Sequence, residues 1–130
     1  MDFNIQYDLH RIRMVQSIYR TFRRISDSAH GNVKGISGCL TPGSLHKVLT
    51  VADVYGLNFM DIGAGDGKPM AAAMACGASS AYGFELPENQ ANKFIFKAAV
   101  SRISDSLFSK SSISRVRLEF KDIEQARSIF

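Results

Sequence analysis

A glycine-rich segment carries the clearest chemical signal: residues 61–67 read Asp-Ile-Gly-Ala-Gly-Asp-Gly. It follows a short apolar run and precedes an alanine- and methionine-rich run, so it lies between a predicted strand and a predicted helix. Glycines at such a turn let the backbone bend tightly and let a ligand lie against bare main chain. Ligands of open α/β sheets bind at the carboxyl ends of the strands. We therefore predict that Gly63, Ala64, Gly65 and Gly67 bind a cofactor.

The residues around this turn distinguish between cofactors. The dinucleotide fingerprint Gly-x-Gly-x-x-Gly needs a third small residue where this sequence has Lys68. The phosphate-binding P-loop pattern is excluded, because Pro69 follows Lys68 where that pattern has Ser or Thr. The carboxylate of Asp61 is poorly suited to a pyrophosphate and well suited to the ammonium of an amino acid. S-adenosylmethionine (SAM) has such an ammonium and no phosphate, so we predict a SAM site, with an NAD-binding fragment as the alternative.

Further candidate cofactor ligands follow the next two predicted strands. Glu85 lies about twenty residues beyond the turn, where an acid accepts hydrogen bonds from the ribose hydroxyls of an adenosine. Leu86 is predicted to flank the adenine. Asp122 is predicted to accept from the adenine amine, with the backbone N–H of Ile123 bonding the ring. Because SAM and NAD both contain adenosine, Glu85 supports either cofactor.

The remainder of the 130 residues supplies the elements that position these groups. Hydrophobic residues make up 45% and charged residues 22%, which is typical of a packed domain. The predicted strands cover residues 57–62, 81–86 and 116–120. The predicted helices cover residues 8–27, 44–54 (with Ser44 as N-cap) and 68–76, and a fourth helix begins at Pro87. The side chains on the inner face of this fourth helix are predicted to be Ala91, Phe94, Ile95, Ala98 and Ile103. A serine-rich loop is expected at 104–114, and a further helix start at the carboxyl end.

Such alternation predicts an α/β fold, a three-layer Rossmann-like parallel sheet that is partial, with about three strands. An N-terminal helical extension precedes it. We expect residues 1–56 to form this helical and loop extension and residues 57–130 to form the partial SAM-binding domain. A parallel sheet of three strands leaves an open edge, which predicts a homodimer through that edge.

The formal net charge is +4, and basic residues concentrate on the predicted helix at 8–27. Its arginines are Arg11, Arg13, Arg20, Arg23 and Arg24. One interpretation is the solvated face of a packing helix. The other is a polyanion contact, in which each cation neutralises a phosphate. The first is favoured, because no recognised nucleic-acid motif accompanies the arginines.

Several classes of protein are excluded or disfavoured. The two cysteines, Cys39 and Cys76, are far apart and form no disulfide framework, and no metal-ligand spacing is present. No run of about 18 apolar residues predicts a membrane span. Acids near the amino terminus disfavour a signal peptide. We expect an intracellular protein, cytoplasmic or nuclear.

The glycine-rich segment with Gly-Phe-Glu at 83–85 resembles motif I and its acidic successor in class I SAM-dependent methyltransferases. The preceding segment, Leu-Thr-Pro-Gly-Ser at 40–44, is similar to the histone-lysine methyltransferases that lack a SET domain and act on the nucleosome core. The resemblance implies a SAM cofactor, a protein or nucleosome substrate, and methylation of a histone lysine in chromatin. In that family the acceptor-side residues follow a fourth strand, so no catalytic residue is assigned here.

Three functions remain open from the sequence. The first is an active methyltransferase, with protein lysine as its acceptor. The second is a truncated or inactive relative that binds SAM and acts through contacts with a partner. The third is a fragment of a nicotinamide dinucleotide enzyme.

Overall fold

Three short parallel strands and four helices make up the part of the chain that the computed structural model describes, residues 3–28, 40–106 and 114–122. In chain order the elements are α1 (Phe3–Ser28), α2 (Pro42–Val51), β1 (Asn58–Ile62), α3 (Lys68–Ala75), β2 (Ser80–Glu85), α4 (Gln90–Ser106) and β3 (Val116–Phe120). The predicted alternation of strands and helices is therefore confirmed, and most element boundaries agree within a few residues.

The strands form one sheet in the order β1-β2-β3, with both pairs parallel. Asp61 of β1 is paired in register with Gly83 of β2, and Glu85 of β2 with Phe120 of β3. Parallel pairing brings the carboxyl ends of all three strands to the same edge of the sheet. The predicted α/β class and partial Rossmann-like sheet are confirmed.

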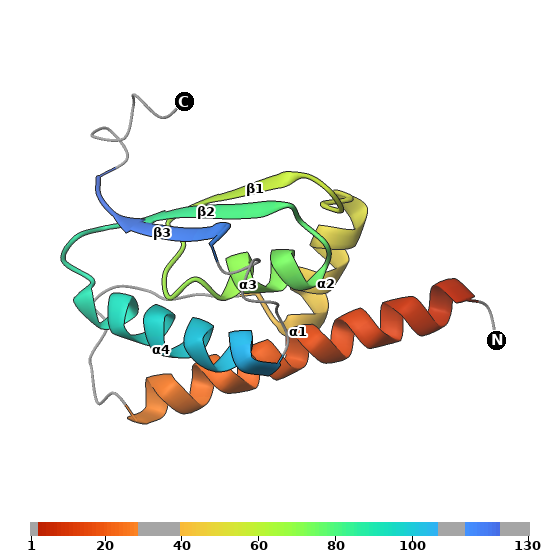
Figure 1. Cartoon of the computed structure of the whole chain (residues 1–130), viewed down its shortest axis with the longest axis horizontal. Coiled ribbons are helices and arrows are strands. Elements are labelled where there is room, and N and C mark those ends of the chain that lie inside the picture. Colours follow the sequence, from red (N-terminus) through yellow and green to blue (C-terminus); the bar gives the residue numbers. More distant parts are fainter. Residues whose placement is uncertain (1–2, 29–39, 107–113, 123–130) are drawn as a thin grey trace.

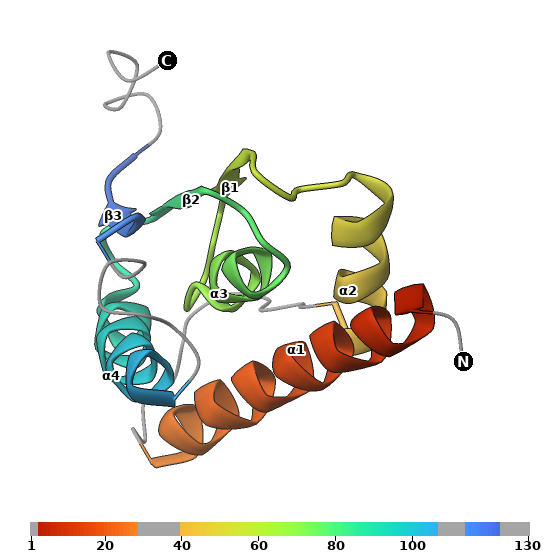
Figure 2. The same ribbon diagram turned by 45° about the vertical axis from the view of Figure 1, so that its right-hand side comes forward.

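The layers run from the sheet through α2, α3 and α4 to α1. Figures 1 and 2 show the four helices on one face of the sheet, with α1 crossing beneath the other three. The helix α3 packs against β1 and β2, and α1 packs against α2, α3 and α4. In the described ranges, the other face of the sheet carries no helix. Among those residues, no helix combines the length and the apolarity that crossing a membrane requires.

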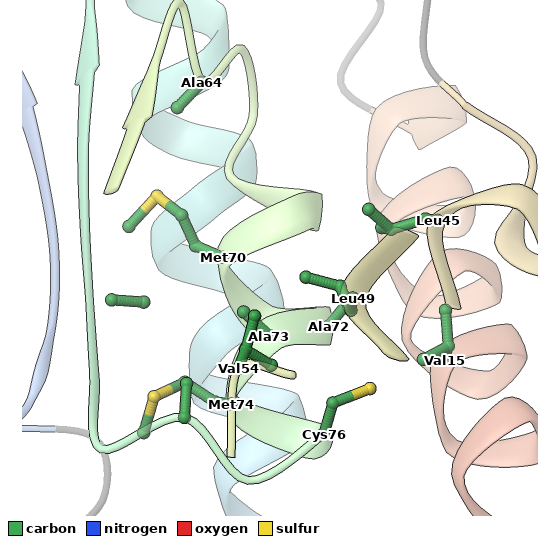
Figure 3. Packing of buried hydrophobic residues seen from close by; sticks show 12 residues of the cluster. Val15, Leu45, Leu49, Val54, Ala64, Met70, Ala72, Ala73, Met74 and Cys76 are labelled. Carbon is green, nitrogen blue, oxygen red and sulfur yellow. The ribbon is translucent and has the colours of Figure 1, made fainter. Parts of the chain in front are cut away.

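The helix α3 is the centre of the core because it is apolar on every side. Residues 70–74, Met-Ala-Ala-Ala-Met, are all buried, as expected for a helix covered all round. Figure 3 shows Met70 extending from α3 toward the strands. Leu45 and Leu49 of α2 and Val15 of α1 belong to the same apolar cluster. The small alanine side chains let the surrounding elements approach α3 closely.

A second cluster fixes α1 against α4. Buried side chains of α1 meet buried side chains of α4 and one face of α3; they are Ile18, Phe22, Ile25, Ala71, Ile95, Ala99 and Ile103. The predicted inner face of the fourth helix is wrong at Phe94, whose side chain is 59% exposed, while Ile95 and Ile103 are buried as predicted. The neighbouring Asn92 is buried instead.

Three helix starts differ from the sequence prediction. The helix α1 begins at Phe3 rather than at residue 8. The N-cap of α2 is Thr41 rather than Ser44, and its Oγ1 accepts from the backbone N–H of Ser44 at 3.2 Å. Pro42 then takes the first helical position, where its fixed φ suits a helix and its missing N–H has no consequence. The helix α4 begins at Gln90 rather than at Pro87 and extends to Ser106, into the predicted serine-rich loop. The predicted helix start after residue 122 lies outside the described residues.

One edge of the sheet is formed by β1, which pairs with β2 alone within the described ranges. Phe59 packs against the core, whereas Met60 and Ile62 are 44% and 59% exposed. Leu57, directly before the strand, is 56% exposed. Apolar side chains are therefore exposed along an edge strand that is paired on one side only in the described ranges, the arrangement that favours association with another strand. The predicted homodimer through this edge stays a prediction.

Gly83 lets β2 lie directly on α3. A Cβ at this position would collide with Met70 Sδ and lie 2.9 Å from Ala64 Cβ and 3.1 Å from Leu118 Cδ1. Gly83→Ala is therefore expected to lower the free energy of unfolding by about 1–3 kcal/mol, the usual range for overpacking a core. Chemical denaturation measures this change. Gly43→Ala is the matched control, because a Cβ at Gly43 meets no atom within 4 Å; equal losses in both variants would contradict this packing.

Candidate cofactor site

The glycine turn leaves the carboxyl end of β1 and is held to the neighbouring strand. The backbone N–H groups of Gly63 and Ala64 both donate to the carbonyl oxygen of Phe84, each at 2.9 Å. Gly63 and Gly65 have φ angles of 75° and 59°, in the region that side chains rarely adopt. A Cβ at Gly63 would meet no atom within 4 Å. At Gly63 the turn thus presents bare main chain next to open space, and its contact with a cofactor stays a prediction.

At the start of α3, a side chain of the protein itself binds a backbone N–H group that a ligand could otherwise bind. Gly67 has a φ of 89°, and a Cβ there would lie 2.5 Å from Phe96 Cδ2, so this glycine is required by packing. Asp66 Oδ1 accepts from the backbone N–H of Lys68 at 3.1 Å, and its Oδ2 lies 3.3 Å from Lys68 Nζ. A carboxylate of the chain therefore already occupies the amino-terminal end of this helix, where a dinucleotide-binding protein places the pyrophosphate.

Glu85 faces the glycine turn from the end of β2. Its Oε1 accepts from the backbone N–H of Leu86 at 2.7 Å and from Asn89 Nδ2 at 3.3 Å. Its Oε2 lies 3.9 Å from the position of a Cβ at Gly65. Two hydrogen bonds thus orient the carboxylate and leave one oxygen directed at the turn. Asn89 was not predicted; the only signal for it is its place in the polar turn that follows the strand.

Asp61 is a partly buried carboxylate near the end of β1. Within the ranges that the structure describes, no hydrogen bond or ion pair reaches its side chain. Burial, and then the negative charge of Glu85, raise the pKa of the Asp61 carboxyl above its ordinary value. The charged form is therefore destabilised in the protein alone. A cationic ligand placed beside it would reverse both effects.

The donor set suits SAM better than a dinucleotide. The ammonium of SAM would meet the unpaired carboxylate of Asp61, and the ribose diol would meet the free oxygen of Glu85. A pyrophosphate in the same place would approach both carboxylates and find the start of α3 already capped by Asp66. Among the described residues, no cluster of His, Cys, Asp or Glu could hold a metal ion.

For the residues predicted to contact the adenine, the structure gives exposure and position in the fold but no contact with the glycine turn. Leu86 is 46% exposed, so its side chain is accessible to a ligand, whereas Phe84 is buried and serves packing. Asp122 is exposed and lies two residues beyond β3, at the edge where the other strands end. Its contact with the adenine stays a prediction. Ile123 lies outside the described residues.

Comparisons with known proteins support the fold. No family model matches the sequence, and no curated protein matches it. The crystal structure of a protein described as a "putative RNA methyltransferase", from Pyrococcus horikoshii, matches with a TM-score of 0.50 and 16% identity, over 80% of this chain and 52% of that chain. This chain therefore spans about half the length of that structure. None of these comparisons supports the histone-lysine type, and at 16% identity the likeness shows a shared Rossmann-like fold.

Proposed function

We propose that this chain binds SAM at the carboxyl ends of β1 and β2 and forms the cofactor-binding part of a SAM-dependent methyltransferase. The observation that carries the proposal is the Asp61 carboxylate, which is partly buried, unpaired in the described part of the chain, and repelled by Glu85. Such a group is destabilising unless a cation meets it, and the ammonium of SAM is a cation of suitable size.

The two ends of SAM would be held by different strands. Asp61 on β1 would hold the amino-acid end and Glu85 on β2 the ribose, with the main chain of Gly63 and Gly65 between them. The sulfonium activates the methyl group of SAM, so the protein's task is to orient the cofactor and exclude water. The resemblance of the glycine turn to motif I and the fold shared with the Pyrococcus horikoshii protein both support this assignment.

Two acceptors of the methyl group are proposed, and one experiment compares them. The resemblance of residues 40–44 suggests a histone lysine, and the fold shared with an RNA methyltransferase, as the Pyrococcus horikoshii protein is described, suggests RNA. The full chain is incubated with SAM labelled in its methyl group and with total RNA, nucleosomes or neither. We expect label in one polymer only. Label in neither polymer, from a chain that binds SAM, would contradict transfer by this chain to either acceptor and leave the cofactor site intact.

A second function is favoured by the uncovered side of the sheet. Met60 and Ile62 of β1 leave apolar side chains exposed next to the candidate site. A SAM-binding module that works through a partner, or through a second copy of itself, would cover them. Sedimentation with and without SAM tests self-association, and a monomer under all conditions would contradict the homodimer.

A further inference from the structure

A pocket lined by two arginines and a lysine includes Lys68, the residue that directly follows the glycine turn. Its volume is about 520 Å³. One wall is a stripe of α1, formed by Gln16, Tyr19, Arg20, Arg23 and Ser26, whose spacing follows one face of the helix. The rest of the lining is Lys68, at the start of α3, and Pro42, the first residue of α2. Three elements that are distant in sequence therefore contribute to it.

The charge of this pocket is not balanced. Arg20 and Arg23 are exposed, and among the side chains that the structure describes no carboxylate pairs with either of them. Residues 9–26 of α1 contain no Asp or Glu, and the acids nearest to this range on the helix are Asp8 and Asp27, directly before and after it. Lys68 shares its charge with Asp66 at 3.3 Å and lies 5.5 Å from the centre of the Tyr19 ring. Two guanidinium groups one helical turn apart are thus left to attract an anion.

We propose that this pocket binds phosphate groups of a polynucleotide strand. The planar guanidinium donates two parallel hydrogen bonds to phosphate, which makes arginine the preferred residue for such contacts. The volume suits a group of nucleotide size. Tyr19 also lines the pocket; its ring packs against the core and its hydroxyl donates to the carbonyl oxygen of Leu40, so it forms a fixed aromatic part of the wall beside the arginines.

The pocket separates the arginines of α1 into those that the proposal assigns to a polyanion contact and those that it leaves on a solvated helix face. Arg20 and Arg23 line it, whereas Arg13 and Arg24, seven residues before and four residues after Arg20, are exposed and do not. Since Lys68 directly follows Gly67, a bound strand lies beside the candidate cofactor site. The inference deepens the RNA alternative of the proposed function, and because strand binding needs no SAM, failure of this pocket and failure of the cofactor site give different results.

The test compares two double variants of equal charge. The full chain is titrated with a labelled single-stranded RNA of about 20 nucleotides over a range of salt concentrations. We expect Arg20→Ala with Arg23→Ala to weaken binding at least about 10-fold and to reduce the salt slope by about 1.4, since each lost phosphate contact contributes about 0.7. Arg13→Ala with Arg24→Ala, the control, is expected to change binding less than about 3-fold.

Other outcomes overturn the proposal. Equal weakening by both double variants would mean a diffuse electrostatic attraction to the helix. Inorganic phosphate binding as tightly as the RNA would mean a small-anion site, and polyglutamate binding more tightly would mean an acidic protein partner. Because the four arginines are exposed, thermal melting of both double variants should match the parent chain. SAM titrations of the same variants show whether the cofactor site is unaffected.

Discussion

The substitution Asp61→Asn is expected to weaken SAM binding by about 10- to 100-fold, because it removes a charge-assisted hydrogen bond to the ligand ammonium. The same substitution is expected to raise the thermal midpoint of the unliganded protein at neutral pH. The Asp61 carboxylate is partly buried near Glu85, and both conditions destabilise its charged form. An amide of the same shape has no charge to desolvate. Calorimetry and thermal melting measure the two effects on one preparation.

The pH dependence of SAM binding follows from the same carboxyl group. Its raised pKa means that the folded chain holds the Asp61 proton more tightly than the unfolded chain does. The contribution of Asp61 to the stability of the unliganded protein therefore falls as pH rises from the ordinary pKa through the raised one. Affinity for SAM rises over the same interval, because only the carboxylate attracts the ammonium. Asp61→Asn should remove both trends, and a variant that keeps them would contradict the role given to Asp61.

The substitution Glu85→Gln is expected to weaken SAM binding by a similar factor, about 10- to 100-fold. Glutamine can still accept from the N–H of Leu86 and from Asn89 through its carbonyl oxygen, so the loop after β2 should keep its shape. The second carboxylate oxygen, Oε2, is replaced by an amide NH₂ group, which donates hydrogen bonds and can no longer accept them from the ribose hydroxyls. Isothermal titration of SAM against the variant measures the loss.

Methylthioadenosine separates these two variants, because it has the adenosine part of SAM and lacks the amino-acid part. Glu85→Gln should weaken methylthioadenosine and SAM alike. Asp61→Asn should weaken SAM and leave methylthioadenosine unchanged. The reverse pattern, or an equal effect of both variants on both ligands, would mean that the cofactor does not lie across the two strands as proposed.

The parts of the fold that were predicted correctly are those with local signals. The strand at 116–120 and the glycine turn are recognisable from alternation and from glycines that need a positive φ, and both depend on short stretches of chain. Parallel pairing followed from the alternation of strands and helices. Together these placed Asp61, Gly65 and Glu85 at one edge of a sheet. The approach of Glu85 Oε2 to Gly65 agrees with that prediction.

The parts that were missed depend on tertiary packing. Phe94 was assigned to the core by its apolar character, yet the face of α4 that meets α1 is set by Ile95, Ala99 and Ile103. The placement of all four helices on one face of the sheet follows from contacts between distant segments. The basic pocket likewise combines residues 20 and 23 with residue 68, and no sequence pattern joins them.

The central claim is that Asp61 and Glu85 together hold SAM, and direct calorimetry of the purified chain tests it. We expect saturable 1:1 binding of SAM and of its demethylated product, and no binding of NAD under the same conditions. Binding of NAD in preference to SAM, or no heat with either SAM or its product, would contradict the account.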